Sequence, residues 1–242
     1  MTENLMIVAR IRTPFKEKFG IPRQSGLAPS LRGTIEFEKP YRNPDWIKGI
    51  EEYSHLWLIF DFSLSHREEF APMVYPPRLG GKEKKGVFAT RTPFRPNSMG
   101  LSSVKLEEVI IDERKGPLLV VSGADLLDGT PVYDIKPYLP YADCHADAVG
   151  SFGEDRSKEK IKVFLPENVR ERLSPETCQK MVEVLEQDPR AAYNKKEDYV
   201  YGMSFMDYDI RFRIDDGTLV VLEVVDRGGN AYIPVKGTGN KA

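Results

Sequence analysis

Short apolar segments, separated by loops rich in proline and glycine, occupy the first 150 residues of this chain. The 242 residues include 18 prolines and 19 glycines, and a helical pattern appears there only briefly, at residues 45–53. Proline fixes the backbone and interrupts regular structure, so each such loop ends the segment before it. Many short strands with turn signals between them predict a closed or nearly closed β-barrel. The apolar segments lie at residues 5–11, 31–37, 55–62, 86–89, 103–111, 118–123 and 131–138, and the loops at residues 20–29, 72–81 and 128–131.

The pattern changes near residue 150, where the polar residues 150–158 have the composition of a linker. A short strand is expected at residues 161–165, and Ser174 followed by Pro175 is typical of the start of a helix. Apolar and charged residues alternate over residues 207–214, and Asp216-Gly217 then predicts a tight turn into a second strand. We therefore expect a mainly β protein with two domains, a β-barrel over residues 1–148 and a small α+β domain over residues 155–242.

Composition excludes several classes of protein. Charged residues make up 30% of the chain, its mean hydropathy is -0.42, and no apolar run is long enough to cross a bilayer. The N-terminus lacks the basic and apolar regions of a signal peptide. Cys144 and Cys178 match no CxxC pattern, and the three histidines lack the spacing of metal ligands. We expect a cytoplasmic protein with no membrane span, no disulfide framework and no metal.

Charge is distributed unevenly along the chain. Residues 1–105 contain 17 Lys and Arg against 11 Asp and Glu, a net charge of +6, whereas residues 106–242 contain 18 against 26, a net charge of -8. Within residues 78–105, seven basic side chains face a single acid, Glu83. Local positive potential attracts polyanions such as nucleic acid, although a solvated loop with scattered lysines is the simpler alternative.

The stretch at residues 86–102 concentrates this positive charge on a stiff loop. The loop contains two prolines, Pro93 and Pro96, and a glycine follows at position 100. Its polar side chains include Arg91, Arg95 and Asn97. Prolines leave such a loop little entropy to lose when it binds a ligand. Two guanidiniums and an amide suit a phosphate or the edge of a nucleotide. An ordinary surface loop with exposed arginines is the alternative.

Two aspartates, Asp125 and Asp128, follow the strand expected at residues 118–123. They can accept hydrogen bonds from a ribose or an amine, or Asp128 can cap the turn that it begins with Gly129. Asp134 and Lys136 fall on one face of the next strand, where a local ion pair is the alternative to a binding role. His55, at the head of an apolar strand, is expected to be buried and hydrogen-bonded. The sequence contains no G-x-G-x-x-G, P-loop or G-x-S-x-G motif, which argues against the usual nucleotide folds.

Several motifs, taken in order, resemble the TsaA-like (YaeB-like) family, which includes bacterial tRNA methyltransferases. The resemblance covers about residues 5–145 and is dense, and residues 150–242 resemble, with weaker motifs, the smaller C-terminal domain of the bacterial members. The motifs are Pro22-Arg23-Gln24, Ser54-His55-Leu56-Trp57, Pro77-Arg78-Leu79-Gly80-Gly81, residues 86–91, Arg95-Pro96-Asn97, residues 125–131 and residues 134–138.

This resemblance implies an S-adenosylmethionine-dependent enzyme, active as a homodimer, built on a β-barrel in place of a Rossmann sheet. The implied reaction adds a methyl group to the exocyclic N6 of threonylcarbamoyladenosine next to the anticodon of threonine tRNA. Relatives carry His where this chain has Ser63, so the resemblance leaves that side-chain role lost or transferred to His66. The motifs place the cofactor contacts at Pro22, Arg23, Gln24, Ser63, Leu64, Arg91, Leu101, Asp125, Leu126, Leu127 and Asp128.

Contacts with tRNA are expected from Arg95, Asn97, Lys136 and Tyr138, because cations bind phosphate and a ring can stack on a base. The residue that accepts the proton of the amine stays open: a backbone carbonyl, Asp125 or Asp128 can serve. Two other functions remain as alternatives. One is a non-catalytic barrel that binds RNA or a nucleotide, and the other is a hydrolase that uses His55 with an aspartate.

Overall fold

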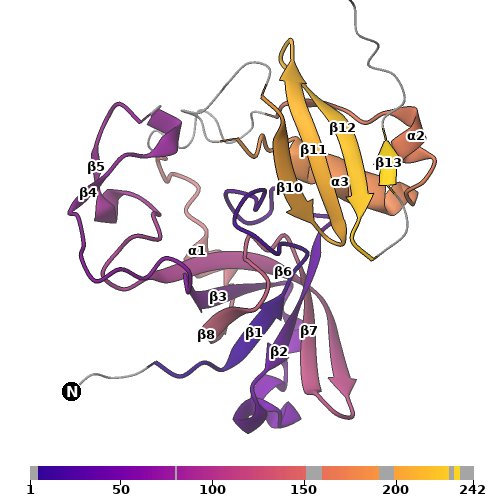
Figure 1. Cartoon of the computed structure of the whole chain (residues 1–242). Helices are drawn as coiled ribbons and strands as arrows, with labels where there is room; N and C mark the ends of the chain where they lie inside the picture. Colours follow the sequence, from indigo (N-terminus) through magenta and orange to yellow (C-terminus); the bar gives the residue numbers. More distant parts are fainter. Residues whose placement is uncertain (1–4, 80, 151–159, 191–198, 229–231, 235–242) are drawn as a thin grey trace, which may run out of the picture.

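The computed structural model describes residues 5–79, 81–150, 160–190, 199–228 and 232–234. A β-barrel forms one part of the molecule, and a second sheet, backed by helices, lies beside one end of it (Figure 1). We call this second part, β9–β13 with α2 and α3, the C-terminal unit. Within the described ranges, no helix has the length and apolar character needed to span a membrane.

Six antiparallel strands close the barrel in the order β1-β2-β7-β6-β3-β8, with β8 pairing back onto β1. The predicted mainly β fold with an N-terminal barrel is therefore confirmed. Alternate residues of each strand point inward, as the period of two requires, and Ile11, Ile35, Leu58, Leu119 and Val121 meet there fully buried. The strands are β1 (Ala9–Arg12), β2 (Arg32–Phe37), β3 (His55–Asp61), β6 (Met99–Asp112), β7 (Gly116–Ser122) and β8 (Thr130–Pro137).

Gly100, near the start of β6, is required by packing across the ladder. It pairs with Phe60 of β3, and a Cβ at Gly100 would lie 2.2 Å from the Phe60 ring. A side chain there would displace a core aromatic ring, so the glycine after the proline-rich loop lets β6 approach β3.

The connections of the barrel contain short helical turns instead of a full helix. The helical pattern at residues 45–53 becomes 3-10 turns at Pro44–Ile47 and Ile50–Glu52, after an earlier one at Lys39–Tyr41. The side chain of Asn43 accepts a 3.0 Å hydrogen bond from the Asp45 backbone amide and so caps the turn at Pro44–Ile47.

A long excursion between β3 and β6 carries the small strands β4 (Met73–Val74) and β5 (Lys85–Gly86). It projects from the barrel on the side away from β2 and β7 (Figure 1). The strand expected at residues 86–89 is wrong beyond Gly86, because Val87–Ala89 forms a 3-10 turn. The backbone amide and the hydroxyl of Thr90 both donate to the Val87 carbonyl, at 3.2 and 2.9 Å, and this closes the turn. A further 3-10 turn lies at Pro77–Leu79.

After a short helix, α1 (Pro140–Asp143), the chain leads to the C-terminal unit. Its sheet has the order β10-β11-β12-β13, and β9 pairs in parallel with β12. The linker expected at residues 150–158 lies, beyond Gly150, outside the described residues. The elements are β9 (Lys162–Phe164), α2 (Glu167–Arg170), α3 (Pro175–Leu185), β10 (Tyr201–Phe205), β11 (Tyr208–Asp215), β12 (Thr218–Asp226) and β13 (Tyr232–Pro234).

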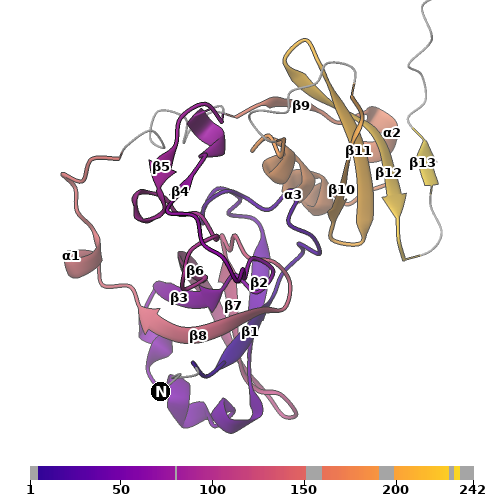
Figure 2. The same ribbon diagram turned by 60° about the vertical axis from the view of Figure 1, so that its left-hand side comes forward.

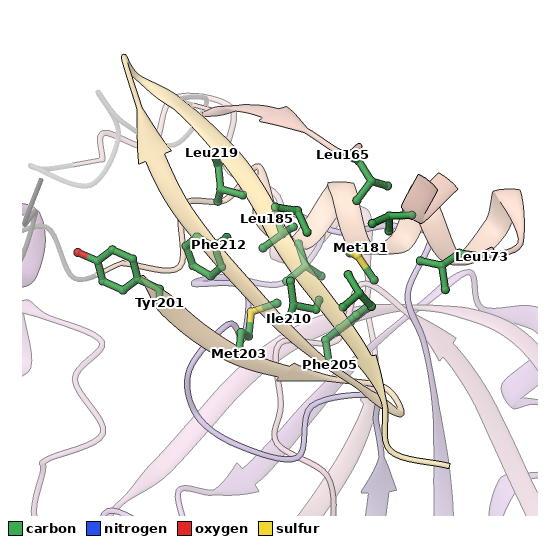
Figure 3. Close-up of a cluster of buried hydrophobic side chains, with 14 of the residues drawn as sticks. Leu165, Leu173, Met181, Leu185, Tyr201, Met203, Phe205, Ile210, Phe212 and Leu219 are labelled. Atoms are coloured by element: carbon green, nitrogen blue, oxygen red, sulfur yellow. The ribbon is translucent and has the colours of Figure 1, made fainter. Parts of the chain in front are cut away.

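Helix α3 begins as the sequence predicts. Ser174 is the N-cap, with its hydroxyl accepting a 3.1 Å bond from the Thr177 amide, and Pro175 occupies the first turn. The apolar face of α3, with Met181 and Leu185, packs on Phe205 and Phe212 of the sheet (Figure 3). The predicted hairpin is β11 and β12, joined at Asp216-Gly217, both of which have positive φ angles.

We expect Leu119→Ala, in the barrel core, to lower the free energy of unfolding by about 2–5 kcal/mol, because Leu119 is fully buried and its loss leaves a cavity. The control Ile111→Thr changes a side chain on the neighbouring strand that is 59% exposed, and should cost no more than about 0.5 kcal/mol. Urea unfolding of both variants measures the difference. Equal losses would contradict the assignment of the core.

Candidate functional site

Residues 13–31, between β1 and β2, form a loop that runs between the barrel and the C-terminal unit (Figure 2). We call it the shared loop. It carries the first motif expected to bind the cofactor: Pro22 is buried, Arg23 is exposed and Gln24 is partly buried. The Arg23 guanidinium donates to the backbone carbonyls of Asp188 and Arg190 in the C-terminal unit, at 3.0 and 3.1 Å. The side chain of Arg23 is therefore directed toward the C-terminal unit.

The structure joins this motif to the arginine loop, residues 90–98. Arg91 Nη1 donates a 2.7 Å hydrogen bond to Gln24 Oε1, and Gln24 Nε2 donates to the Arg23 carbonyl at 2.6 Å. Two motifs separated by 67 residues in the sequence thus meet side by side. The Gln24 side chain is oriented from both ends, and Arg91 remains exposed beside it.

Asp125 lies under this junction. Its Oδ1 accepts a 2.6 Å bond from the buried hydroxyl of Ser102, and the Ser25 backbone amide also contacts the carboxylate. Burial raises the pKa of the Asp125 carboxyl above its usual value, although the Ser102 bond and the nearby Arg91 charge act in the opposite direction. The Ser25 hydroxyl donates to the Ser103 carbonyl on β6. We call Gln24, Ser25, Arg91, Ser102 and Asp125 the rim cluster.

Asp128 has a different environment. Its Oδ1 accepts from the Thr13 backbone amide at 3.0 Å, and its Oδ2 accepts from Lys16 Nζ at 2.8 Å. Burial alone would raise the pKa of Asp128, but the bonds from Lys16 and Thr13 outweigh it and lower the pKa. Asp128 therefore fastens the start of the shared loop. Leu127 is partly buried, whereas Leu126 is only 2% exposed and packs in the barrel core, with its carbonyl accepting from the Thr13 hydroxyl at 2.9 Å.

Residues 62–67 lie between the shared loop and the arginine loop, and they place Ser63 and Leu64 at the surface. Lys18 Nζ donates to the Leu64 carbonyl at 2.7 Å, which ties the segment to the shared loop. On the other side, the Phe62 amide donates to the Ser98 carbonyl at 2.8 Å, and the Arg67 guanidinium lies 3.7 Å from the centre of the Phe94 ring. The segment thus borders the same region as the rim cluster.

His66, in this segment, is held by a buried acid. Its Nε2 lies 2.7 Å from Asp61 Oδ1, and Asp61 is only 9% exposed. Burial and the Asp61 carboxylate also raise the pKa of Tyr133, which hydrogen bonds with Asp61. The sequence motifs missed Asp61, because a lone acid at the end of an apolar strand carries no pattern.

Leu101 completes the region on β6. It is 52% exposed on the outer surface of the barrel, opposite Ile59 of β3 and two residues from Met99, which is 37% exposed. An exposed leucine beside an exposed methionine offers an apolar surface next to the rim cluster.

The residues expected to contact tRNA fall in two places. Arg95 lies 5.8 Å from the Phe88 ring centre and donates to the Thr90 carbonyl at 3.4 Å, and Asn97 is exposed in the same loop. Lys136, on β8, lies beside Trp57 near the start of β3. It forms a 2.9 Å ion pair with Asp134, and the hydrogen bond with Asp134 raises the pKa of Lys136. The ring of Tyr138 packs on Trp57, with 5.5 Å between centres.

His55 differs from its prediction. It is exposed at the first position of β3, so the expected burial is wrong. The expected hydrogen bond is confirmed, since Nδ1 lies 2.9 Å from Ser54 Oγ. Among the described residues, no group of three or more His, Cys, Asp or Glu could hold a metal ion.

Comparisons with known proteins agree with these features. The tRNA-methyltransferase O N-terminal domain matches residues 10–144, and the TrmO C-terminal domain matches residues 158–227. The chain is 40% identical to the tRNA (adenine(37)-N6)-methyltransferase of Escherichia coli, over 90% of this chain and 95% of that protein. A crystal structure of TrmO from Pseudomonas aeruginosa is 36% identical, covers 93% of this chain and 99% of that one, and has a TM-score of 0.74. The family resemblance inferred from the motifs is confirmed.

The two aspartates should affect stability in opposite directions with pH. The pKa of Asp125 is raised on folding, so the contribution of this carboxyl to stability falls as the pH rises above about 3.8, where it ionises first in the unfolded chain. Asp125→Asn removes this loss, and its stability relative to the wild type should increase across that range.

The pKa of Asp128 is lowered, so its stabilisation is present above about 3.8 and is lost as the pH falls. The deficit of Asp128→Asn should therefore shrink on acidification. Urea titrations at several pH values test both, and parallel trends would contradict the two environments.

Proposed function

Because the chain belongs to the tRNA-methyltransferase O family, we propose that it transfers a methyl group from S-adenosylmethionine to the exocyclic N6 of adenosine 37 in tRNA. We further propose that this adenosine carries threonylcarbamoyl, that the tRNA is a threonine isoacceptor, and that the enzyme is a cytoplasmic homodimer. Residues 1–148 would form the cofactor-binding and catalytic domain, and residues 155–242 a smaller second domain.

The strongest support is the convergence of three separate motifs and Leu101 beside one exposed surface of the barrel. The bond from Arg91 to Gln24, the partly buried Asp125 and the exposed Leu101 offer the types of group that the donor needs. A guanidinium suits its carboxylate, a carboxylate suits its ribose hydroxyls, and an apolar surface suits its adenine. We propose that backbone groups contribute at positions 22, 126 and 127, and that Ser63 and Leu64 border the site.

The second aspartate, Asp128, is expected to affect donor binding without contacting the donor. Asp128 is occupied by Thr13 and Lys16, so we propose that it acts on the donor by fixing the shared loop. The same holds for Arg23, whose guanidinium is bound to the C-terminal unit. Both residues keep the backbone of the loop in place without a side-chain contact to the donor.

S-Adenosylmethionine, when bound, supplies an activated methyl group on a positively charged sulfur. The task of the protein is then mainly to align the amine with that carbon. The adenine amine is a weak nucleophile, so an acceptor for its proton assists the transfer. Burial raises the pKa of Asp125 and makes its carboxylate the stronger base, whereas the bonds from Lys16 and Thr13 lower the pKa of Asp128, so we propose Asp125 as the acceptor.

For the tRNA, we propose that Arg95 and Asn97 bind on the arginine loop and that Lys136 and Tyr138 bind near the start of β3. Residues 78–105, which include the arginine loop, carry seven basic side chains against one acid. Phosphate is attracted to this positive charge. The anticodon stem should therefore approach the barrel from the side of the arginine loop.

The activity is tested with purified chain, S-adenosylmethionine and threonine tRNA that either carries or lacks threonylcarbamoyl. We expect mass spectrometry of the digested tRNA to show one added methyl group on the modified adenosine only. Binding of the donor without methylation of any tRNA would favour the non-catalytic barrel, and no binding of the donor would contradict the proposal. Sedimentation of the same sample tests the homodimer.

Arg91→Ala should raise the Kd for S-adenosylmethionine roughly 10- to 100-fold, as expected for the loss of a hydrogen bond from a charged group. Arg95→Ala should leave that Kd unchanged and weaken tRNA binding, with the slope of log affinity against log salt falling by about 1. Arg114→Ala, in the exposed turn between β6 and β7, is the control. Calorimetry and filter binding measure the two affinities. Mild, equal effects of both arginine variants on stability alone would instead favour an ordinary surface loop.

A further inference from the structure

The shared loop connects two barrel strands, but its apolar side chains pack in the core of the C-terminal unit. Phe15 is 1% exposed, and its ring centre lies 5.9 Å from that of Phe205, while Phe19 stacks on Phe212 at 6.5 Å. Gly20 has a φ of +92°, and a Cβ there would lie 2.2 Å from the Met203 sulfur. The face of β10 and β11 therefore holds the first half of the loop closely.

A rigid turn after α3 holds the second half. Arg190 is 7% exposed, and its Nε and Nη2 donate to the two oxygens of Asp188 at 2.8 and 2.9 Å. This forked pairing between a guanidinium and a carboxylate is strong and directional. It also supports the left-handed backbone of Asp188, with a φ of +47°. The turn thereby presents the carbonyls of Asp188 and Arg190 to the Arg23 guanidinium, which donates to both.

Arg23, which is bound to this turn, is the direct neighbour in sequence of Gln24 in the rim cluster. Arg23 is bound on the side of the C-terminal unit, and Gln24 is bound by Arg91 on the side of the barrel. Pro22, just before them, is buried and has a restricted φ. The Gly26 amide, just after them, donates to the Gly123 carbonyl at 2.9 Å. The backbone of residues 22–24 is thus fixed from both sides.

We propose that Arg23 is a positioning residue and that the turn at residues 188–190 is its anchor, so that the C-terminal unit sets the affinity for the methyl donor without touching it. This inference rests on the proposed function and assigns a role in it to the C-terminal unit. A loop that is ordered before binding spares the ligand the entropy of ordering it. Release of the anchor should therefore weaken donor binding while the active groups of the barrel remain in place.

The test compares Arg23→Ala, Asp188→Asn and the double variant in the full-length chain. Asp188→Asn weakens the forked pair but keeps both carbonyls, and it lies in a different part of the chain from the rim cluster. We expect each single variant to raise the Kd and KM for S-adenosylmethionine about tenfold, with kcat at saturating donor nearly unchanged. The double variant should be no weaker than Arg23→Ala, because both changes break one anchor. Arg213→Ala, which removes the Arg213–Asp215 ion pair of β11, is the control and should leave the Kd unchanged.

Hydrogen exchange of the free protein reads the anchor independently of the donor. In Asp188→Asn, the Gly26 amide should exchange faster, while amides of the barrel strands should keep their protection. If Arg23 instead contacts the donor directly, Asp188→Asn will leave the Kd unchanged, and the inference is overturned. Unchanged exchange at Gly26 would overturn it as well. A wild-type chain that binds no donor would contradict the proposed function, whereas the exchange result would still decide whether the anchor exists.

Discussion

The packing of residues 13–31 between the barrel and the C-terminal sheet is the constraint on which the rest of the structure depends. Asp128 fixes the start of this loop through Thr13 and Lys16, and Phe15 packs into the core of the C-terminal unit. Farther along, the Ser30 hydroxyl donates to Glu183 of α3 at 2.6 Å. A loop of this length would sample many conformations in solution, and these contacts limit it to one. The two parts of the chain therefore share a structural element instead of meeting only at a surface.

The candidate site follows from this arrangement. A methyl transfer needs alignment more than strong acids or bases, and a stiff rim on a closed barrel supplies alignment. The rim cluster is built from the shared loop, the arginine loop, β6 and the segment after β7, so no single stretch of sequence contains it. Each member is held by another member or by the barrel ladder. A change in the shared loop should thus alter the positions of Arg91 and Asp125 without altering the barrel core.

The sequence predicts the features that depend on local patterns. Alternation of apolar residues gave the barrel strands, Ser174-Pro175 gave the start of α3, and Asp216-Gly217 gave the hairpin. The strand prediction for residues 86–89 is wrong because Thr90 closes a turn onto Val87. The predicted burial of His55 is wrong because His55 is the first residue of its strand, at one end of the barrel. Arg23 binds two backbone carbonyls that lie 165 and 167 residues away in the sequence. Every residue has a backbone carbonyl, so no sequence pattern predicts this contact. Motifs therefore predict a candidate site, and the fold distinguishes the side chains left at its surface from those already bound to other parts of the chain.

A crystal structure of the chain with S-adenosylhomocysteine, the spent donor, would show directly whether the shared loop and the barrel rim bind the donor. We expect the ligand beside Arg91, Leu101 and Asp125, against the backbone of residues 22–24, with the Arg23 guanidinium still on the carbonyls of Asp188 and Arg190. This expectation would be contradicted by a ligand whose carboxylate or adenine is bound by the Arg23 side chain. It would equally be contradicted by a ligand in the hollow of the C-terminal sheet lined by Glu17, Ser204 and Arg211.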